Sequence, residues 1–169
     1  MSDDLPPITL VIGGARSGKS AHAEHLIEAA GGGFYLATAD AGDDEMKARI
    51  KAHQDRRGKS WQTIEEPLDL TGALAGLNEP VLVDCLTLWL SNLMMENRDI
   101  EAEFNTLIGI IPSLKNPVIF VTNEVGQGIV PDNKLARDFR DHAGRLNQTI
   151  AAAADQVILM TAGLPHIIK

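Results

Sequence analysis

The chain has 169 residues, of which 44% are hydrophobic and 22% are charged, and its formal net charge at pH 7 is −8. This composition excludes a disordered chain, a collagen-like repeat and a disulfide-stapled scaffold, and the length suits one domain with a substantial core. The negative charge disfavours nucleic acid as the main partner. The one cysteine, Cys85, cannot form an internal disulfide, and we find no signal peptide and no apolar run long enough for a membrane span. We therefore predict a cytoplasmic protein.

Short apolar segments alternate with longer helical patterns along the chain. In chain order, we predict strand Ile8–Ile12, helix Ala21–Ala30, strand Phe34–Ala37, helix Asp43–Arg57, strand Trp61–Ile64, helix Pro67–Leu77, strand Val81–Val83, helices Leu86–Met95 and Ile100–Ile111, strand Val118–Thr122, helix Asp132–Ala154 and strand Val157–Met160. Pro67 suits the first turn of a helix, because N–H groups in that turn make no hydrogen bond within the helix and proline has no N–H. Buried strands separated by helices indicate an α/β fold with a mostly parallel sheet and helices on both faces. We predict a single domain over residues 1–169, with residues 1–7 as a flexible N-terminal extension.

A phosphate-binding motif follows the first predicted strand. Residues 13–20 are Gly13-Gly14-Ala15-Arg16-Ser17-Gly18-Lys19-Ser20, the pattern of a glycine, four residues and then Gly-Lys-Ser. Glycines let successive N–H groups converge on phosphate oxygens, and the following helix adds the positive end of its dipole. Lys19 suits the β- and γ-phosphates, and the hydroxyl of Ser20 suits Mg²⁺. We therefore predict a nucleotide-binding P-loop formed by residues 13–20, in a P-loop NTPase-like, RecA-like fold.

An acidic residue ends another predicted strand. A P-loop site also uses a carboxylate at the end of a neighbouring strand to hold the metal through water, and Asp84 directly follows Val81–Val83. We interpret Asp84 as this metal-binding acid, with capping of the next helix as the alternative. Cys85, beside it, is interpreted as a small core residue rather than a nucleophile.

The second predicted helix concentrates positive charge. From Lys47 to Lys59 there are six cations and one acid, a local net charge of +5. Cations near an imidazole favour its neutral form, which would leave His53 a nitrogen lone pair for attack on a nucleotide phosphate. Arg49, Arg56 and Arg57 are candidates to bind that phosphate. A solvated charged helix with an incidental histidine explains the same spacing, and spacing alone favours that explanation.

Polar residues follow several of the predicted strands. In open α/β sheets, ligands bind beyond the carboxyl ends of the strands. Asn123 and Glu124 begin a glycine-rich loop after Val118–Thr122, and we assign them to substrate binding. Thr38 and Glu65, which follow the second and third predicted strands, are assigned to nucleotide binding. Ordinary loop chemistry explains the loops after Thr38 and Asn123 equally well.

Four blocks of sequence together resemble one known family. They are GGARSGKS at Gly13–Ser20, ATADAGDDEMKARIKAHQDRR at Ala37–Arg57, VDCLTLWLSN at Val83–Asn92 and TNEVGQGIVPDNKLARDFRDHAGRLNQ at Thr122–Gln148. The chain resembles the bifunctional adenosylcobinamide kinase/adenosylcobinamide-phosphate guanylyltransferases of cobalamin biosynthesis. The last block is far more specific than a phosphate loop, and the four blocks run through nearly the whole chain.

This resemblance implies two reactions. The first moves the γ-phosphate of ATP or GTP onto the aminopropanol hydroxyl of adenosylcobinamide. The second attaches GMP from GTP to an enzyme histidine, releasing pyrophosphate, and then passes the GMP to the phosphorylated corrinoid to give adenosylcobinamide-GDP. The family's nucleotidylated histidine, in an Arg-Ile-x-x-His pattern, falls on His53, which reverses the preference drawn from spacing alone.

The resulting prediction is a Mg²⁺-dependent phosphotransferase and guanylyltransferase. His53, Lys19 and Asp84 are its predicted catalytic residues, and Ser20 and Asp84 are its predicted metal-binding residues. The expected partners are GTP or ATP and a corrinoid, and the resemblance implies a homo-oligomer, since related proteins are trimers with active sites between subunits. Two alternatives are a small-molecule P-loop kinase that forms no covalent GMP adduct, and a nucleotide-sensing module that is not an enzyme.

Overall fold

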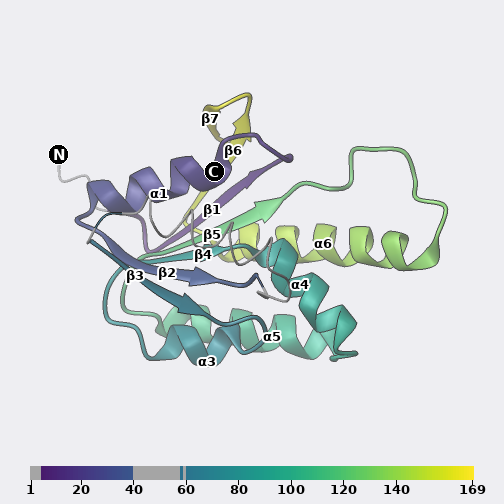
Figure 1. Cartoon of the computed structure of the whole chain (residues 1–169), viewed down its shortest axis with the longest axis horizontal. Coiled ribbons are helices and arrows are strands. Elements are labelled where there is room, and N and C mark those ends of the chain that lie inside the picture. The colour runs from purple at the N-terminus through teal and green to yellow at the C-terminus, as the bar shows by residue number, and fades with distance from the viewer. Residues whose placement is uncertain (1–4, 40–57, 59) are drawn as a thin grey trace.

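In the part of the chain that the structure describes, a seven-stranded sheet forms the centre of the fold. Figure 1 shows the computed structural model, which describes residues 5–39, 58 and 60–169. The strands lie in the order β3-β2-β4-β5-β1-β6-β7, and every neighbouring pair is parallel except β6–β7, which is antiparallel. Their bounds are β1 Ile8–Gly13, β2 Gly33–Ala37, β3 Trp61–Glu65, β4 Val81–Asp84, β5 Val118–Asn123, β6 Gln156–Thr161 and β7 Leu164–Ile167. The predicted mostly parallel α/β sheet is confirmed.

Helices cover both faces of this sheet. Their bounds are α1 Lys19–Ala29, α3 Leu70–Ala75, α4 Leu86–Met95, α5 Ile100–Ile110, the short 3₁₀ helix η1 Ile111–Ser113, and α6 Lys134–Ala153. Figure 1 shows α1 over one face and α3, α4, α5 and α6 against the other. The helix predicted at Asp43–Arg57 lies outside the described residues. Within the described ranges, no helix has the length and apolar character needed to cross a membrane.

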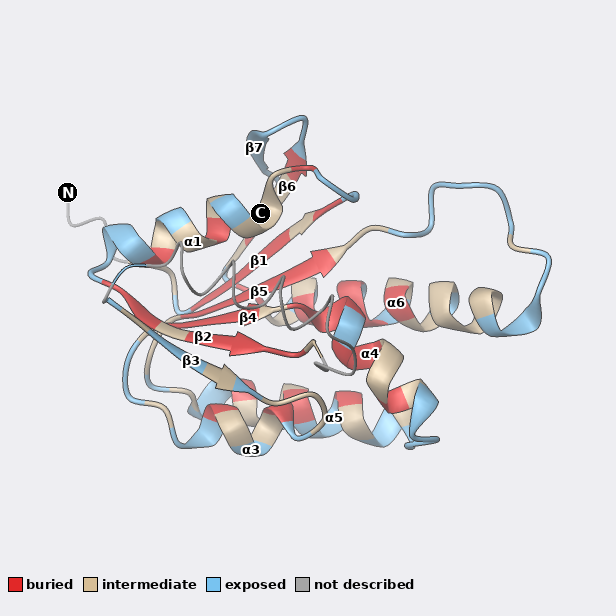
Figure 2. Cartoon of the chain, in the orientation of Figure 1, coloured by how far each residue is buried: buried red, intermediate tan, exposed pale blue. Residues whose placement is uncertain are grey.

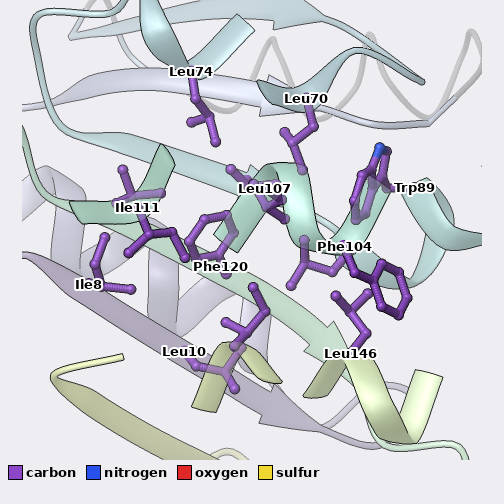
Figure 3. Packing of buried hydrophobic residues seen from close by; sticks show 14 of the residues in the cluster. Ile8, Leu10, Leu70, Leu74, Trp89, Phe104, Leu107, Ile111, Phe120 and Leu146 are labelled. Carbon is purple, nitrogen blue, oxygen red and sulfur yellow. The ribbon is translucent and has the colours of Figure 1, made fainter. Parts of the chain in front are cut away.

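The side chains of the central strands alternate between two hydrophobic clusters, one on each face of the sheet. On β1, Leu10 belongs to the larger cluster with α3 to α6, whereas Val11 belongs to the cluster beneath α1 with Ala23 and Ile27. Figure 3 shows side chains of the larger cluster converging from the strands and the helices of that face. Figure 2 shows that burial is concentrated in the central strands and the inward sides of the helices. Burial on both faces explains why these strands are continuously apolar in sequence.

The helix predicted to start at Pro67 begins three residues later. Helix α3 starts at Leu70 because Asp69 is its N-cap, with Oδ1 accepting a hydrogen bond from the Gly72 N–H at 2.9 Å. Just before it, Glu66 Oε1 accepts from the Asp69 N–H at 2.8 Å, which forms a turn containing Pro67. A carboxylate-stabilised turn therefore occupies the position predicted for the first helical turn.

Both ends of the described chain join the sheet, which the sequence patterns did not predict. Strand β7 pairs with β6, yet all four of its residues are exposed, so it lacks the apolar pattern of a buried strand. At the other end, Leu5 packs against the cluster beneath α1, and the Pro7 carbonyl accepts a hydrogen bond from the Val118 N–H at 2.8 Å. Residues 5–7, predicted as part of a flexible extension, therefore contact the fold.

Helix α6 is expected to depend on its N-cap. Asn133 Oδ1 accepts a hydrogen bond from the Ala136 N–H at 2.8 Å, so the helix begins at Lys134 rather than at Asp132 as predicted. Asn133→Ala removes this acceptor and is expected to lower the free energy of unfolding by about 1 kcal/mol. Urea unfolding followed by circular dichroism measures the change. Asn133→Asp keeps an acceptor and should retain most of the stability, and equal losses in both variants would contradict the capping explanation.

Candidate active site

The P-loop joins β1 to α1 at the carboxyl edge of the sheet. Strand β1 ends at Gly13. Helix α1 begins at Lys19, two residues before the predicted start at Ala21, and Gly18 is its N-cap residue. The Lys19 ammonium donates a hydrogen bond to the Gly14 carbonyl at 3.1 Å, so this side chain is folded over the loop. Because Gly18 provides no capping side chain, the N–H groups of the first helical turn are available to an anion.

The other P-loop residues differ in their exposure. Ala15 and Arg16 are exposed on the outer part of the loop. Ser17 is buried, and its Oγ has no hydrogen-bond partner among the residues that the structure describes. Ser20 is half-buried in the first turn of α1. The loop therefore has one side open to a ligand and one side packed on the protein.

Two positions of this loop, Gly13 and Gly18, have little room for a side chain, and the backbone conformation of Gly18 also favours glycine. A Cβ on Gly13 would lie 2.5 Å from Ser17 Oγ. Gly18 has a φ of 92°, which favours glycine, and a Cβ there would lie 3.2 Å from Gly163 Cα. Gly163, in the turn between β6 and β7, also donates from its N–H to the Ser17 carbonyl at 2.9 Å. The β6–β7 turn therefore packs against the P-loop and forms a hydrogen bond with it, and no motif in the sequence predicts this contact.

The end of β5 lies directly beside the P-loop. Asn123 pairs in register with Gly13, and the Glu124 N–H donates to the Gly13 carbonyl at 3.0 Å. The Glu124 carboxylate accepts from the Gly126 N–H at 2.5 Å, which folds the following loop back on it. The structure thus brings the two residues predicted to bind substrate next to the first residue of the phosphate loop.

A buried polar network holds this end of β5. Thr122 Oγ1 donates to Asn147 Oδ1 at 2.7 Å, and Asn147 Nδ2 donates to the Asn123 carbonyl at 3.2 Å. Thr87 Oγ1 accepts from the Asn123 N–H at 2.8 Å. Mutually satisfied buried groups restrict the strand end to one geometry. Thr87 and Asn147 were missed by sequence analysis because each is a single polar residue in a helical pattern.

Asp84 ends β4, and β4 is not next to the P-loop strand. Strand β5 lies between β4 and β1, so the expectation of a neighbouring strand is wrong, and two strand spacings, about 10 Å, separate them. Asp84 pairs in register with Ala37 and Val121, which belong to the cluster beneath α1. Paired residues share a face of the sheet, so the Asp84 side chain lies on the face that α1 covers. The start of α1 carries Lys19 and Ser20 on this same face.

Thr38 and Cys85 are bonded together next to Asp84. The buried Thr38 hydroxyl donates to the Cys85 carbonyl at 2.6 Å and accepts from the Cys85 N–H at 2.9 Å. This hydroxyl therefore holds the backbone after Asp84, and its contact with a nucleotide stays a prediction. Burial, and secondarily the charge of Asp84, raise the pKa of the Cys85 thiol. The thiol stays protonated at neutral pH, and the interpretation of Cys85 as a core residue is confirmed.

Of the remaining predicted residues, the structure places only Glu65, which lies far from this group. Glu65 is exposed at the end of β3, four strands from β1, about 19 Å by strand spacing. The structure therefore does not bring Glu65 to the P-loop. His53, Arg49, Arg56 and Arg57 lie outside the described residues.

Sequence analysis also missed Tyr35, the one tyrosine of the chain. Its hydroxyl donates to Asp84 Oδ2 at 2.6 Å. In the sequence, Tyr35 is an aromatic residue two positions before the end of a predicted strand. Such a residue could face a site at the strand end, but packing in the core explains its position equally well.

The sheet, the P-loop and the strand-end residues define a P-loop nucleotide-binding protein of the RecA-like type. Solved structures agree with this fold. The flagellar accessory protein FlaH from Methanocaldococcus jannaschii is 12% identical with a TM-score of 0.54, over 98% of this chain and 80% of that one. An ATPase from the type III secretion system of pathogenic bacteria is 12% identical with a TM-score of 0.58, over 94% of this chain and 54% of that one. At these identities the likeness concerns the fold alone.

Sequence comparison gives the particular family. The model of the family described as "Cobinamide kinase / cobinamide phosphate guanyltransferase" matches residues 9–168, and the chain belongs to this family. It is 46% identical over 179 residues to the bifunctional adenosylcobalamin biosynthesis protein CobU of Salmonella typhimurium, covering 95% of this chain and 98% of the relative. It is 44% identical over 166 residues to the bifunctional protein CobP of Pseudomonas aeruginosa, covering 95% and 96%. The prediction of an enzyme with cobinamide kinase and guanylyltransferase activities is confirmed.

Proposed function

We propose that the P-loop edge of this enzyme performs the phosphoryl transfer, with residues 13–20 holding the nucleotide phosphates. The observation that carries this proposal is the placement of Lys19, Ser20 and Asp84 on one face of the sheet at its carboxyl edge. Lys19 and the N–H groups of the first turn of α1 supply positive potential for the β- and γ-phosphates of ATP or GTP. Asn123 and Glu124, beside Gly13, are proposed to contact the corrinoid alcohol that receives the γ-phosphate.

Mg²⁺ fits the oxygen atoms on this face. Mg²⁺ prefers oxygen ligands and completes its shell with water and substrate phosphates. The Ser20 hydroxyl and the Asp84 carboxylate are ligands of this kind. We therefore propose that Ser20 and, through water, Asp84 hold Mg²⁺ together with the nucleotide phosphates. When bound, the ion neutralises charge on the phosphates.

The guanylyl transfer is proposed to pass through His53. The imidazole nitrogen attacks the α-phosphorus of GTP, the bond from this phosphorus to the α–β bridging oxygen breaks, and pyrophosphate leaves. The terminal phosphate of the phosphorylated corrinoid then displaces the histidine, which completes adenosylcobinamide-GDP. The net charge of +5 between Lys47 and Lys59 supports this assignment, because Arg49, Arg56 and Arg57 can stabilise the α-phosphate.

Thr38 and Glu65 remain proposed nucleotide-binding residues.

Labelled nucleotides test both half-reactions. With GTP labelled at its α-phosphate, we expect a protein-bound label that acid releases and base does not, and none when Mg²⁺ is removed by a chelator. With nucleotide labelled at its γ-phosphate, we expect adenosylcobinamide to accelerate transfer and to carry the label. Absence of the bound α-label contradicts the histidine–GMP intermediate, and corrinoid-independent turnover contradicts the kinase assignment.

We also propose a cytoplasmic homo-oligomer, a trimer by resemblance to the family. Three large apolar side chains support a subunit contact, because Met95, Ile129 and Leu135 are 78%, 98% and 69% exposed. Met95 and Leu135 border a cavity of about 460 Å³ between the end of α4 and the start of α6. Light scattering of the purified protein measures its mass, and a monomer at micromolar concentration would contradict this part of the proposal.

A further inference from the structure

The side chain of Asp84 is held by a hydroxyl from another strand. Tyr35, on β2, donates from its Oη to Asp84 Oδ2 at 2.6 Å. This distance is within the normal range of a hydrogen bond from a hydroxyl to a carboxylate oxygen. The contact lies on the face of the sheet beneath α1, where both Tyr35 and the neighbours of Asp84 belong to the smaller cluster.

The register of the sheet explains why these two residues meet. Asp84 pairs with Ala37 and Leu82 pairs with Tyr35, so Tyr35 and Asp84 are diagonal neighbours on one face. Diagonal side chains on adjacent strands lie about 7–8 Å apart at the backbone, a gap that a tyrosine ring can span. A shorter hydroxyl side chain at position 35 would not reach the carboxylate.

The tyrosine ring is itself held in place. Tyr35 is only 6% exposed, and its ring packs edge-on against Trp61 of β3, with ring centroids 6.1 Å apart and an interplanar angle of 74°. Trp61 Nε1 in turn donates to Glu28 Oε1 at 3.2 Å. The hydroxyl therefore reaches Asp84 from a ring with little freedom to move.

Together these contacts fix both the backbone and the side chain of the strand-end acid. The Thr38 hydroxyl bonds to the N–H and the carbonyl of Cys85, which fixes the backbone after Asp84. The Tyr35 hydroxyl binds Oδ2, which restricts the side-chain torsions of Asp84 and leaves Oδ1 for other partners. Outer partners of this kind orient the carboxylates that serve metal ions.

We propose that Tyr35 is a positioning residue that holds the Asp84 carboxylate in the orientation needed for the Mg²⁺–nucleotide complex. This inference rests on the proposed metal role of Asp84. It predicts that Tyr35→Phe, which keeps the buried ring and removes only the hydroxyl, raises the Mg²⁺ concentration for half-maximal kinase rate about tenfold. The KM for the corrinoid should stay unchanged, and the melting temperature should fall by only about 3 °C.

Two controls separate the positioning role from general damage. Thr106→Val removes a hydroxyl on α5 that donates within its own helix, to the Ala102 carbonyl at 2.8 Å, and should leave the Mg²⁺ dependence unchanged. Asp84→Ala tests the underlying metal role. If Asp84→Ala leaves the Mg²⁺ dependence intact, the metal role of Asp84 is wrong. If Asp84→Ala weakens it and Tyr35→Phe does not, the positioning role of Tyr35 is wrong.

A second readout does not depend on activity. Because the chain has one tyrosine, labelling tyrosine with ¹³C at Cζ yields a single NMR resonance that reports on this hydroxyl. In the nucleotide-free protein, Asp84→Ala should shift that resonance by removing the charged acceptor, and Thr106→Val should not. A Cζ resonance unmoved by Asp84→Ala would show that the hydrogen bond is absent in solution and would overturn the proposal.

Discussion

Replacing His53 by alanine is expected to abolish covalent labelling of the protein by GTP that carries its label in the α-phosphate. The imidazole nitrogen is the proposed nucleophile, and alanine offers no atom that can form the bond to phosphorus. Overall guanylyl transfer to the phosphorylated corrinoid should fall by about 10³-fold or more, because loss of a nucleophile removes the covalent route altogether. Transfer of the γ-phosphate to the corrinoid alcohol should continue, since the P-loop residues are unchanged.

The control for this variant is another histidine outside the proposed chemistry. His166 is exposed on β7, and His166→Ala should retain the full α-label. A label that survives in His53→Ala, or one that is lost in both variants, would contradict the assignment of His53. Purified His53→Ala should also give the wild-type far-ultraviolet circular dichroism spectrum, which separates loss of a nucleophile from loss of fold.

Replacing Lys19 by alanine is expected to reduce γ-phosphate transfer by about 10³-fold, the usual cost of removing a group that stabilises transition-state charge in a preorganised site. The Lys19 ammonium folds over the P-loop and donates a hydrogen bond to the Gly14 carbonyl at 3.1 Å. Among the described residues, no other lysine makes this contact. Lys19→Arg should not restore the rate, since the guanidinium is planar and larger than an ammonium. Initial rates with γ-labelled nucleotide measure both variants.

Lys115 gives a matched control for the loss of one positive charge. It is exposed shortly before the start of β5, and is therefore at the opposite edge of the sheet from the P-loop. Lys115→Ala should keep the wild-type rate. Equal losses in Lys19→Ala and Lys115→Ala would point to overall charge rather than to the loop, and an unchanged rate in Lys19→Ala would contradict the proposed kinase site.

Local patterns predicted most of the central strands because those strands are buried on both faces. Val81–Val83 and Val118–Thr122 differ from the observed β4 and β5 by a single residue at one end. Strand β7 was missed for the opposite reason, since its exposed residues carry no burial pattern. The start of α3 was misplaced because the Glu66 and Asp69 carboxylates cap a turn at Pro67, and propensity alone does not distinguish that turn from a first helical turn.

The nucleotide loop, its strand-to-helix setting and the family resemblance followed from residue order alone, because each depends on neighbours in the chain. Tertiary structure alone decided that β5 separates β4 from β1, that Asn123 lies beside Gly13, and that Tyr35 reaches Asp84. These relations join segments distant in sequence. They depend on the order and register in which strands pair, and hydrophobic patterns do not encode that pairing because every central strand is apolar in the same way.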